Sequence, residues 1–432
     1  MQTLEIKDFI KTKQDSKSHT EEEINFFIKN LSQFTQDEIT EWLKAVKRNG
    51  MDDKETTSLT LAMANSGTVL SWEGLEPTID KHSTGGIGDK VTLLFAPLIA
   101  AYGINVPKLS GRSLGFSGGT IDKLESISGF KTNLSTEQIK EQVKKIGLAI
   151  CSASTELAPA DKKLYFIRDV TDTVDSIPLI ASSIMSKKIA GGSKNIILDV
   201  KFGSGAFMKT LKEAQALARK MVTIGKNLNK NTKAVISDMN QPLGYAVGNT
   251  LEIKEVLEVL SGKEIKDLIE IVICLAKEAI AGANLKPQEG NLESKLREIL
   301  LHGKALKKFE EMISAQGGNL KSIFNPEKKA KYIESLKSNC EGYIQNIDAL
   351  LIGEVVHELG AGRKSVSDQI DHSVGILFHK KHGDKVVKDE PILEIHAKCK
   401  EDAEFAKRKL SSALKFGQNE PGKLKLVHEI VR

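Results

Sequence analysis

Cysteine is scarce in this sequence, and its four copies are scattered. They lie at Cys151, Cys274, Cys340 and Cys399, with no Cys-x-x-Cys pair among them. A disulfide framework or a cysteine-ligated metal site is therefore not expected, and reduced thiols are the default. Histidine pairs of the form His-x-x-x-His or His-Glu-x-x-His are also absent, which excludes the helical zinc motif of metalloproteases.

Long apolar segments are missing as well. Residues 1–7 lack the apolar core of a signal peptide. The longest apolar run extends from Val91 to Val106, but Pro97 and Gly103 interrupt it and it is too short to span a bilayer. We therefore expect a cytoplasmic protein with no membrane partner.

No basic tract with interleaved aromatic residues occurs. Aromatic residues make up only 5% of the chain, and 62 basic residues face 57 acidic ones, for a net charge of +5. This balance is weak evidence for a nucleic-acid partner, because an anionic small substrate accounts for it equally well. The 432 residues suffice for two or three domains with buried cores, so we expect a globular protein that does not bind nucleic acid.

What the sequence does contain is a pair of loops rich in glycine and hydroxyl side chains. They occupy residues 80–92 (DKHSTGGIGDKVT) and 108–120 (KLSGRSLGFSGGT) and flank one apolar, helix-length segment. Neither loop matches the Walker pattern, and the Gly-x-Gly at 86–88 lacks the third glycine of the dinucleotide fingerprint. Gly-rich turns that merely join strands to helices are the simpler interpretation of each loop alone.

Two such loops together favour an anion site. Successive backbone N–H groups of a Gly-rich loop can converge on one anion, and charged and hydroxyl donors complete the shell around a phosphate. We predict that both loops hold one phosphate. The side chains that would take part are Lys81, Ser83, Thr92, Lys108, Ser110 and Thr120.

The rest of the chain changes pattern three times. Residues 1–70 show helical apolar spacing after a capping box that starts at Thr20. Short strands then alternate with helices, which predicts a mostly parallel sheet with both loops at its carboxyl edge. Predicted strands are 106–109, 196–202 and 234–239, and predicted helices are 135–146, 161–190, 211–224 and several within 250–340. From about Gly342, alternating short strands and tight turns predict a small α+β module.

Seven motifs, in order, resemble those of the thymidine/pyrimidine-nucleoside phosphorylase family, closest to its pyrimidine-nucleoside phosphorylases. They stand at 81–86 (KHSTGG), 110–112 with 118–125 (SGR, GGTIDKLE), 157–163 (LAPADKK), 168–171 (RDVT), 182–188 (SSIMSKK), 198–208 (LDVKFGSGAFM) and 241–244 (QPLG). The long second motif is highly specific, and the matches imply a resemblance over nearly the full length.

The resemblance implies a fold of three parts. These are a small helical domain (1–70 with 162–194), a large mostly parallel-sheet α/β domain (71–161 with 195–340) and a C-terminal α+β module (341–432). It also implies a homodimer that needs no cofactor and uses inorganic phosphate to cleave pyrimidine nucleosides such as uridine, thymidine and deoxyuridine. The products are the free base and (deoxy)ribose 1-phosphate.

The resemblance further implies roles for individual residues. The six phosphate-binding residues are those predicted above. The pyrimidine contacts are Arg168, Ser183, Lys187, Leu114, Ile180 and Phe207, and the catalytic residues are His82, Arg168 and Lys187. His82 would donate a proton or a hydrogen bond to the base. Some members bind a monovalent cation, K+, and the matching positions are Gly88, Lys90, Leu243, Ala246 and Glu255, although Lys90 offers no side-chain oxygen.

Three departures from the usual family string concern substrate range. The chain has Ser113, Phe116 and Ser117 where Gly, His and Thr are commonest. Lys108 stands where broad-specificity members carry Lys and thymidine-specific ones Met, so we expect both uridine and thymidine to be accepted. One alternative is a thymidine-specific phosphorylase. A second is a phosphoribosyltransferase on a related fold, but the sequence has no acidic metal-binding cluster beside the loops. A third is a non-catalytic binding protein, in which Phe116 would indicate that activity has been lost.

Overall fold

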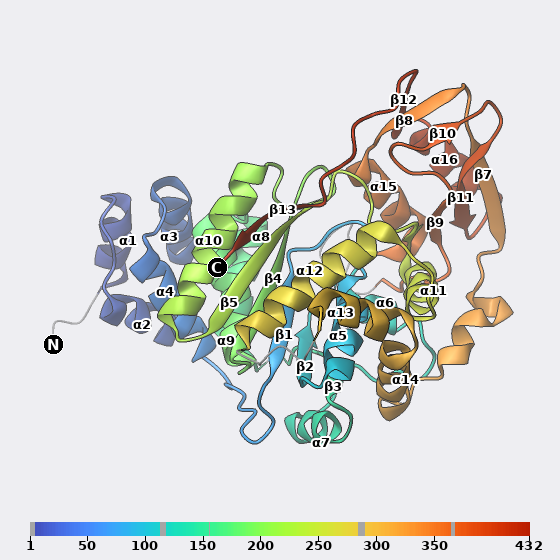
Figure 1. Cartoon of the computed structure of the whole chain (residues 1–432). Helices are drawn as coiled ribbons and strands as arrows, with labels where there is room; N and C mark the ends of the chain where they lie inside the picture. Colours follow the sequence, from blue (N-terminus) through green and yellow to red (C-terminus); the bar gives the residue numbers. More distant parts are fainter. Residues whose placement is uncertain (1–4, 113–117, 155, 284–289, 364–367) are drawn as a thin grey trace.

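The computed structural model has three parts arranged along the molecule, with a helical bundle at one end, a central sheet, and a C-terminal module at the other end (Figure 1). The residues that the structure describes are 5–112, 118–154, 156–283, 290–363 and 368–432. Within these ranges, none of the helices has the length and apolar character needed to cross a membrane.

The helical bundle begins with four short helices. They are α1 (Ile6–Gln14), α2 (Glu21–Lys29), α3 (Gln36–Asn49) and α4 (Asp53–Ala64). The last three start with capping boxes, in which the N-cap side chain and the N3 carboxylate satisfy free backbone N–H groups at Thr20, Thr35 and Asp52. These local signals explain why each helix begins where it does.

The bundle core is aromatic and includes two later helices. The ring of Phe27 lies 4.7 Å from the rings of both Phe9 and Trp42. Helix α8 (Pro159–Val170) and the first turn of α9 (Ile177–Ala190) pack into the same core. The rest of α9 packs against the central sheet. This one helix therefore connects both parts.

The central sheet has the strand order β1-β4-β5-β13. Strands β1 (Ile79–Ser83), β4 (Asn195–Phe202) and β5 (Asn231–Asp238) are parallel, whereas β13 (Val427–Val431) runs antiparallel to β5. A parallel pair, β2 (Val106–Ser110) and β3 (Leu148–Ser152), continues beside β1 through a Thr78–Asn105 bridge. The predicted mostly parallel sheet is confirmed.

Each face of the central sheet is covered by helices, because alternate strand residues point to opposite sides. Ile197 of β4 packs with α5 (Val91–Tyr102) and α12 (Lys266–Gly282), and its neighbours Ile196 and Leu198 pack with α9 and α10 (Leu211–Asn227). The remaining helices of this part are α6 (Thr120–Leu124), α7 (Thr136–Ile146), α11 (Asn249–Leu260), α13 (Leu292–Leu301) and α14 (Lys304–Ala315).

The C-terminal module contains two antiparallel sheets and two helices, as an α+β module should. One sheet is β6-β9-β11-β7 and the other is β10-β8-β12. Their bounds are β6 (Ala246–Val247), β7 (Tyr332–Lys337), β8 (Gly342–Ile347), β9 (Gly375–Phe378), β10 (Lys385–Val386), β11 (Pro391–Ala397) and β12 (Leu414–Gly417). The two helices are α15 (Ala349–Val356), which continues into the short segment η3 (His357–Ala361), and α16 (Lys400–Leu410). The short segments η1 (Leu320–Phe324) and η2 (Pro326–Lys328) precede β7, and Ile323 of η1 packs in the core of the α/β part.

Two strands cross the predicted limits of this module, 341–432. Strand β7 precedes residue 341 but belongs to the module, because it pairs with β11. The last strand, β13, leaves the module and joins β5 in the central sheet (Figure 1). Strand partners are chosen by tertiary packing, so a pattern read along the chain does not reveal them.

Candidate active site

The first Gly-rich loop follows the carboxyl end of β1 and leads into α5. Lys81 of β1 is fully buried, with its Nζ 3.3 Å from Oγ1 of Thr92 and 3.2 Å from the Asp199 carboxylate of β4. An ammonium group is stable there because a carboxylate compensates its charge. Two predicted phosphate contacts, from the strand and from the helix start, are thus brought together.

Asp89 forms hydrogen bonds to residues on both sides of it in the first Gly-rich loop. The Ser83 hydroxyl donates to the Asp89 carboxylate, which also accepts the backbone N–H of Val91 at 3.2 Å. Burial alone would raise the pKa of Asp89, but the positive charges of Lys201 and Lys81 outweigh it and hold this pKa far below its usual value. The loop therefore carries a fixed negative charge beside several lysines.

The second loop follows the carboxyl end of β2, so the predicted position of both loops at one edge of the sheet is confirmed. Lys108 of β2 is buried, donates to the Leu109 carbonyl at 2.7 Å and lies 3.5 Å from the Asp80 carboxylate. Burial and the nearby charge of Lys188 lower the pKa of Lys108 to about 7. Ser110 ends β2 and Thr120 begins α6, and neither hydroxyl hydrogen bonds to any described residue.

The predicted pyrimidine contacts Ser183 and Lys187 lie on one face of α9. The Lys187 ammonium donates to the carbonyl oxygen of Ser183 at 3.0 Å and to its hydroxyl at 3.2 Å, and it pairs with the Asp161 carboxylate of α8. The Lys187 side chain is 42% exposed. It is therefore a solvent-accessible cation whose orientation is set by two helices.

Arg168 of α8 is buried and forms hydrogen bonds to the backbone of the segment that follows this helix. Its guanidinium donates to the carbonyl oxygens of Thr173 at 3.3 Å, Val174 at 2.8 Å and Leu179 at 3.1 Å. Three of its five N–H groups thus tie α8 to the following loop and to the first turn of α9, which leaves two for a ligand. Burial lowers the pKa of Arg168 from its usual value.

His82 follows Lys81 on β1. Its Nε2 is buried and has no hydrogen-bond partner among the described residues. Burial, followed by the charges of Lys188, Lys108, Lys81 and Lys187, lowers the pKa of His82 well below its usual value. The positive charges of lysines on α9 and on both strands therefore favour the neutral form of this imidazole.

The three apolar residues predicted to contact the pyrimidine differ in their position and exposure. Ile180 lies on α9 and is buried in the core between that helix and the sheet. Phe207, in the loop after β4, is 51% exposed. Leu114 lies outside the described residues, as do Ser113, Phe116 and Ser117.

The five positions for which the resemblance implies a K+ site do lie together, but a lysine fills the centre. The Lys90 ammonium donates to the carbonyl oxygens of Leu243 and Ala246 and to the Glu255 carboxylate. A β-carbon added at Gly88 would come within 2.5 Å of the Leu243 carbonyl oxygen, so the loop also touches this turn. The donor set therefore does not fit a bound metal ion, because its oxygens already coordinate an ammonium group.

Sequence reasoning missed several charged residues of the site. Lys188 donates to the Asp80 carboxylate at 2.7 Å and Lys201 pairs with Asp199 at 2.9 Å, all of them buried. Lys188 and Lys201 stand inside motifs that carry the family resemblance. A lysine within a largely apolar strand, such as Lys201 two residues after Asp199 in ILDVKF, was the signal that could have revealed one of them.

Comparisons with known proteins agree with this arrangement. The family model described as glycosyl transferase family, a/b domain matches residues 75–306, more than half of the chain. The helical bundle domain of the same family matches residues 7–67, and the pyrimidine nucleoside phosphorylase C-terminal domain matches residues 343–417. All three parts of the fold are thus matched in order.

Two relatives are similar to this chain in sequence over most of its length, and one solved structure is similar to it in fold. A pyrimidine-nucleoside phosphorylase of Staphylococcus haemolyticus is 45% identical over 99% of this chain and 100% of its own length. One from Staphylococcus epidermidis is 48% identical over 91% of this chain and 92% of its own. Anthranilate phosphoribosyltransferase of Thermus thermophilus shares the fold, with a TM-score of 0.59, 18% identity and coverage of 72% of this chain and 99% of its own. The chain therefore belongs to the glycosyl transferase family that joins a helical bundle to an a/b domain, in the branch with a pyrimidine nucleoside phosphorylase C-terminal domain.

Proposed function

We propose that this protein is a pyrimidine-nucleoside phosphorylase, which uses inorganic phosphate to convert uridine, thymidine or deoxyuridine into free base and (deoxy)ribose 1-phosphate. The observation that carries this proposal is the contact of Lys188 with Asp80 of β1 and with the Leu109 carbonyl of β2, which brings α9, the helix of Lys187, against the two strands that carry the predicted phosphate-binding lysines. Lysines from the strands suit a phosphate dianion, and the accessible Lys187 suits the carbonyl edge of a pyrimidine. The names of the relatives support the same reaction.

The chemistry follows from two charged groups on opposite sides of the nucleoside. A phosphate oxygen forms a bond to the anomeric carbon, the bond from that carbon to the base nitrogen breaks, and the base leaves with the electron pair. The proton of hydrogen phosphate ends on the base and balances the reaction. Lys187 and Arg168 would stabilise the negative charge that develops on the base, which is the main electrostatic contribution available here.

His82 would act as a neutral hydrogen-bond donor and not as an acid. Its lowered pKa favours this one of the two predicted roles, because a neutral imidazole still has one N–H to offer to a base carbonyl. Lys187 would exchange one of its contacts with Ser183 for the base, since its three N–H groups already have acceptors. Leu114, Ile180 and Phe207 are proposed to line the pyrimidine ring.

The test is phosphate-dependent release of uracil from uridine and of thymine from thymidine by the purified protein in the presence of a metal chelator. We expect release of both bases and none without phosphate. A parallel assay without chelator would test the alternative: release of uracil from uridine 5′-monophosphate that needs pyrophosphate and Mg²⁺, with none from uridine, would identify a phosphoribosyltransferase. Binding without release would identify a non-catalytic protein. Use of thymidine with no use of uridine would refute the broad substrate range that we infer from Lys108.

We also propose a cytoplasmic homodimer. The support is an apolar patch on α8, where Phe166 and Val170, four residues apart, are 64% and 57% exposed. Light scattering after gel filtration should give the mass of a dimer. The variant Phe166→Glu should give a monomer, since a charge would then have to be buried in the contact.

A further inference from the structure

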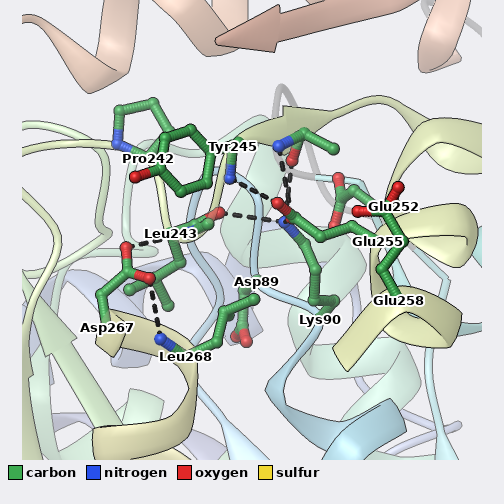
Figure 2. A network of polar contacts seen from close by, with 12 residues as sticks. Asp89, Lys90, Pro242, Leu243, Tyr245, Glu252, Glu255, Glu258, Asp267 and Leu268 are labelled. Carbon is green, nitrogen blue, oxygen red and sulfur yellow. Dashed lines mark hydrogen bonds and ion pairs between the residues drawn. The ribbon is translucent and has the colours of Figure 1, made fainter. Parts of the chain in front are cut away.

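Lys90 lies at the start of α5, directly after the first Gly-rich loop, and its ammonium group is enclosed by oxygen atoms (Figure 2). Nζ is 2.9 Å from the carbonyl oxygen of Leu243 and 2.8 Å from that of Ala246, and it pairs with the Glu255 carboxylate of α11. The Lys90 side chain is fully buried and Glu255 is 4% exposed. Each of its three N–H groups has an acceptor.

The oxygen cage is itself fixed by backbone contacts. The Glu255 carboxylate accepts the N–H of Tyr245 at 2.6 Å and that of Ala246 at 3.2 Å (Figure 2). From the other side, Lys381 of the C-terminal module donates to the carbonyl oxygens of Pro242 and Gly244. Four carbonyl groups of the turn at 242–246 thus accept from two lysines, and that of Tyr245 accepts the backbone N–H of Phe378. The oxygen cage around Lys90 is therefore held in place by its own contacts.

Carbonyl and carboxylate oxygens are the ligands of a hard cation. An ammonium group offers the same single positive charge as K+ but brings three directional N–H bonds. A second cation is excluded, because two like charges at contact distance repel strongly in a buried site. Burial alone would lower the pKa of Lys90, but the charges of Glu255 and Glu252 outweigh it and raise this pKa, so the group stays charged.

We propose that the Lys90 ammonium is a built-in replacement for a bound monovalent cation, which fastens the phosphate loop to the turn at 242–246 and to α11 without K+. Lys90 is a positioning residue: its neighbours Asp89 and Val91 belong to the loop that surrounds the phosphate position, and Thr92 follows one residue later. The covalent link to the loop makes this cation permanent, whereas a bound ion would dissociate.

The test compares three proteins, each in KCl and in tetramethylammonium chloride at about 0.15 M, where general screening is equal. The wild-type unfolding midpoint and Michaelis constant for phosphate should be the same in both salts. Lys90→Ser opens the cage and leaves its oxygens free, so its midpoint should fall by several degrees in tetramethylammonium and recover in K+. Lys90→Met fills the cage without charge, so its midpoint should fall in both salts without recovery.

Three results would overturn the proposal: a K+-specific rise in the wild-type midpoint, a Lys90→Met protein as stable as wild type, or a Lys90→Ser protein that does not respond to K+. A Lys90→Ser protein that is insoluble in both salts counts against it too, since K+ should restore the fold. Anomalous scattering from Rb+-soaked crystals gives a direct readout, with a site expected in Lys90→Ser and none in wild type. Unfolding and Rb+ binding do not depend on the reaction, so they test Lys90 even if the proposed phosphorolysis fails.

Discussion

The carboxylate of Asp80 on β1 accepts a hydrogen bond of 2.7 Å from the ammonium of Lys188 on α9. Both side chains are buried, and Lys188 also donates to the Leu109 carbonyl of β2 at 3.3 Å. This contact fastens the helix that carries Lys187 to the strands that carry Lys81 and Lys108, the two lysines predicted to bind phosphate. One buried ion pair therefore links the two halves of the candidate site, in addition to the apolar packing of α9 on the sheet.

We expect Lys188→Met to lower the free energy of unfolding by about 3 kcal/mol, because it leaves the buried Asp80 carboxylate with the more distant Lys108 alone. Urea unfolding measures this loss. Lys144→Met, which removes an exposed lysine of α7, should change the free energy by less than about 0.5 kcal/mol. Equal stability of the two variants would show that the Asp80 contact does not hold α9 in place.

We expect Lys187→Ala to abolish turnover, with a loss of at least about 10²–10³ in kcat, since the cation that would stabilise the departing base is gone. The fold should remain intact, because this side chain is 42% exposed, but with a lower free energy of unfolding, because the buried Asp161 carboxylate loses its ion-pair partner. Steady-state kinetics and circular dichroism provide the two measurements. Lys194→Ala, at an exposed lysine beyond the end of α9, is the matched control and should keep full activity. Retained turnover of Lys187→Ala would contradict the base-binding assignment.

Anion binding should depend on pH through Lys108. Its pKa of about 7 means that the free protein loses this charge as the pH rises, whereas a bound dianion would keep the ammonium protonated. Sulfate, a dianion throughout this range, should therefore bind more weakly above about pH 7, by up to about tenfold per pH unit. Calorimetric titration should also detect proton uptake. Lys108→Met should bind sulfate weakly with a flatter pH profile, and parallel profiles of the two proteins would contradict this role.

The helical bundle should owe its acid sensitivity to Glu55. Burial alone would raise the pKa of this carboxyl, but hydrogen bonds from His19 and Lys13 outweigh it and lower the pKa to about 2. The resulting stabilisation, about 3 kcal/mol, is complete above about pH 4.5 and is lost as the pH falls toward 2. Thermal unfolding of Glu55→Gln should show a deficit at neutral pH that disappears in acid. Glu22→Gln, on the exposed face of α2, should follow wild type at every pH.

Much of the local structure could be predicted from short-range patterns. The capping box at Thr20, the strand at 196–202 and the helix from 211 all occur where apolar spacing and capping residues place them. The two Gly-rich loops stand at the carboxyl ends of β1 and β2. These features depend on neighbours a few residues away, which is the distance over which a sequence pattern is informative.

Other features depend on partners that are remote along the chain. Strand β13 adds to a sheet whose other strands end near residue 238, and β7 pairs with β11, a strand much later in the chain. Arg168, predicted to face a pyrimidine, also ties together the backbone between α8 and α9. None of these partners leaves a periodic signal, because packing and not spacing selects them.

The sequence alone determined the order of helices and strands, the two Gly-rich loops and the family motifs. Each of these features depends on residues that are adjacent or a few positions apart in the chain. The tertiary structure decided which buried charges meet: Lys188 with Asp80, and Lys90 with oxygen atoms more than 150 residues away. A buried ammonium needs acceptors on every side, and only the packed chain brings those acceptors to one point.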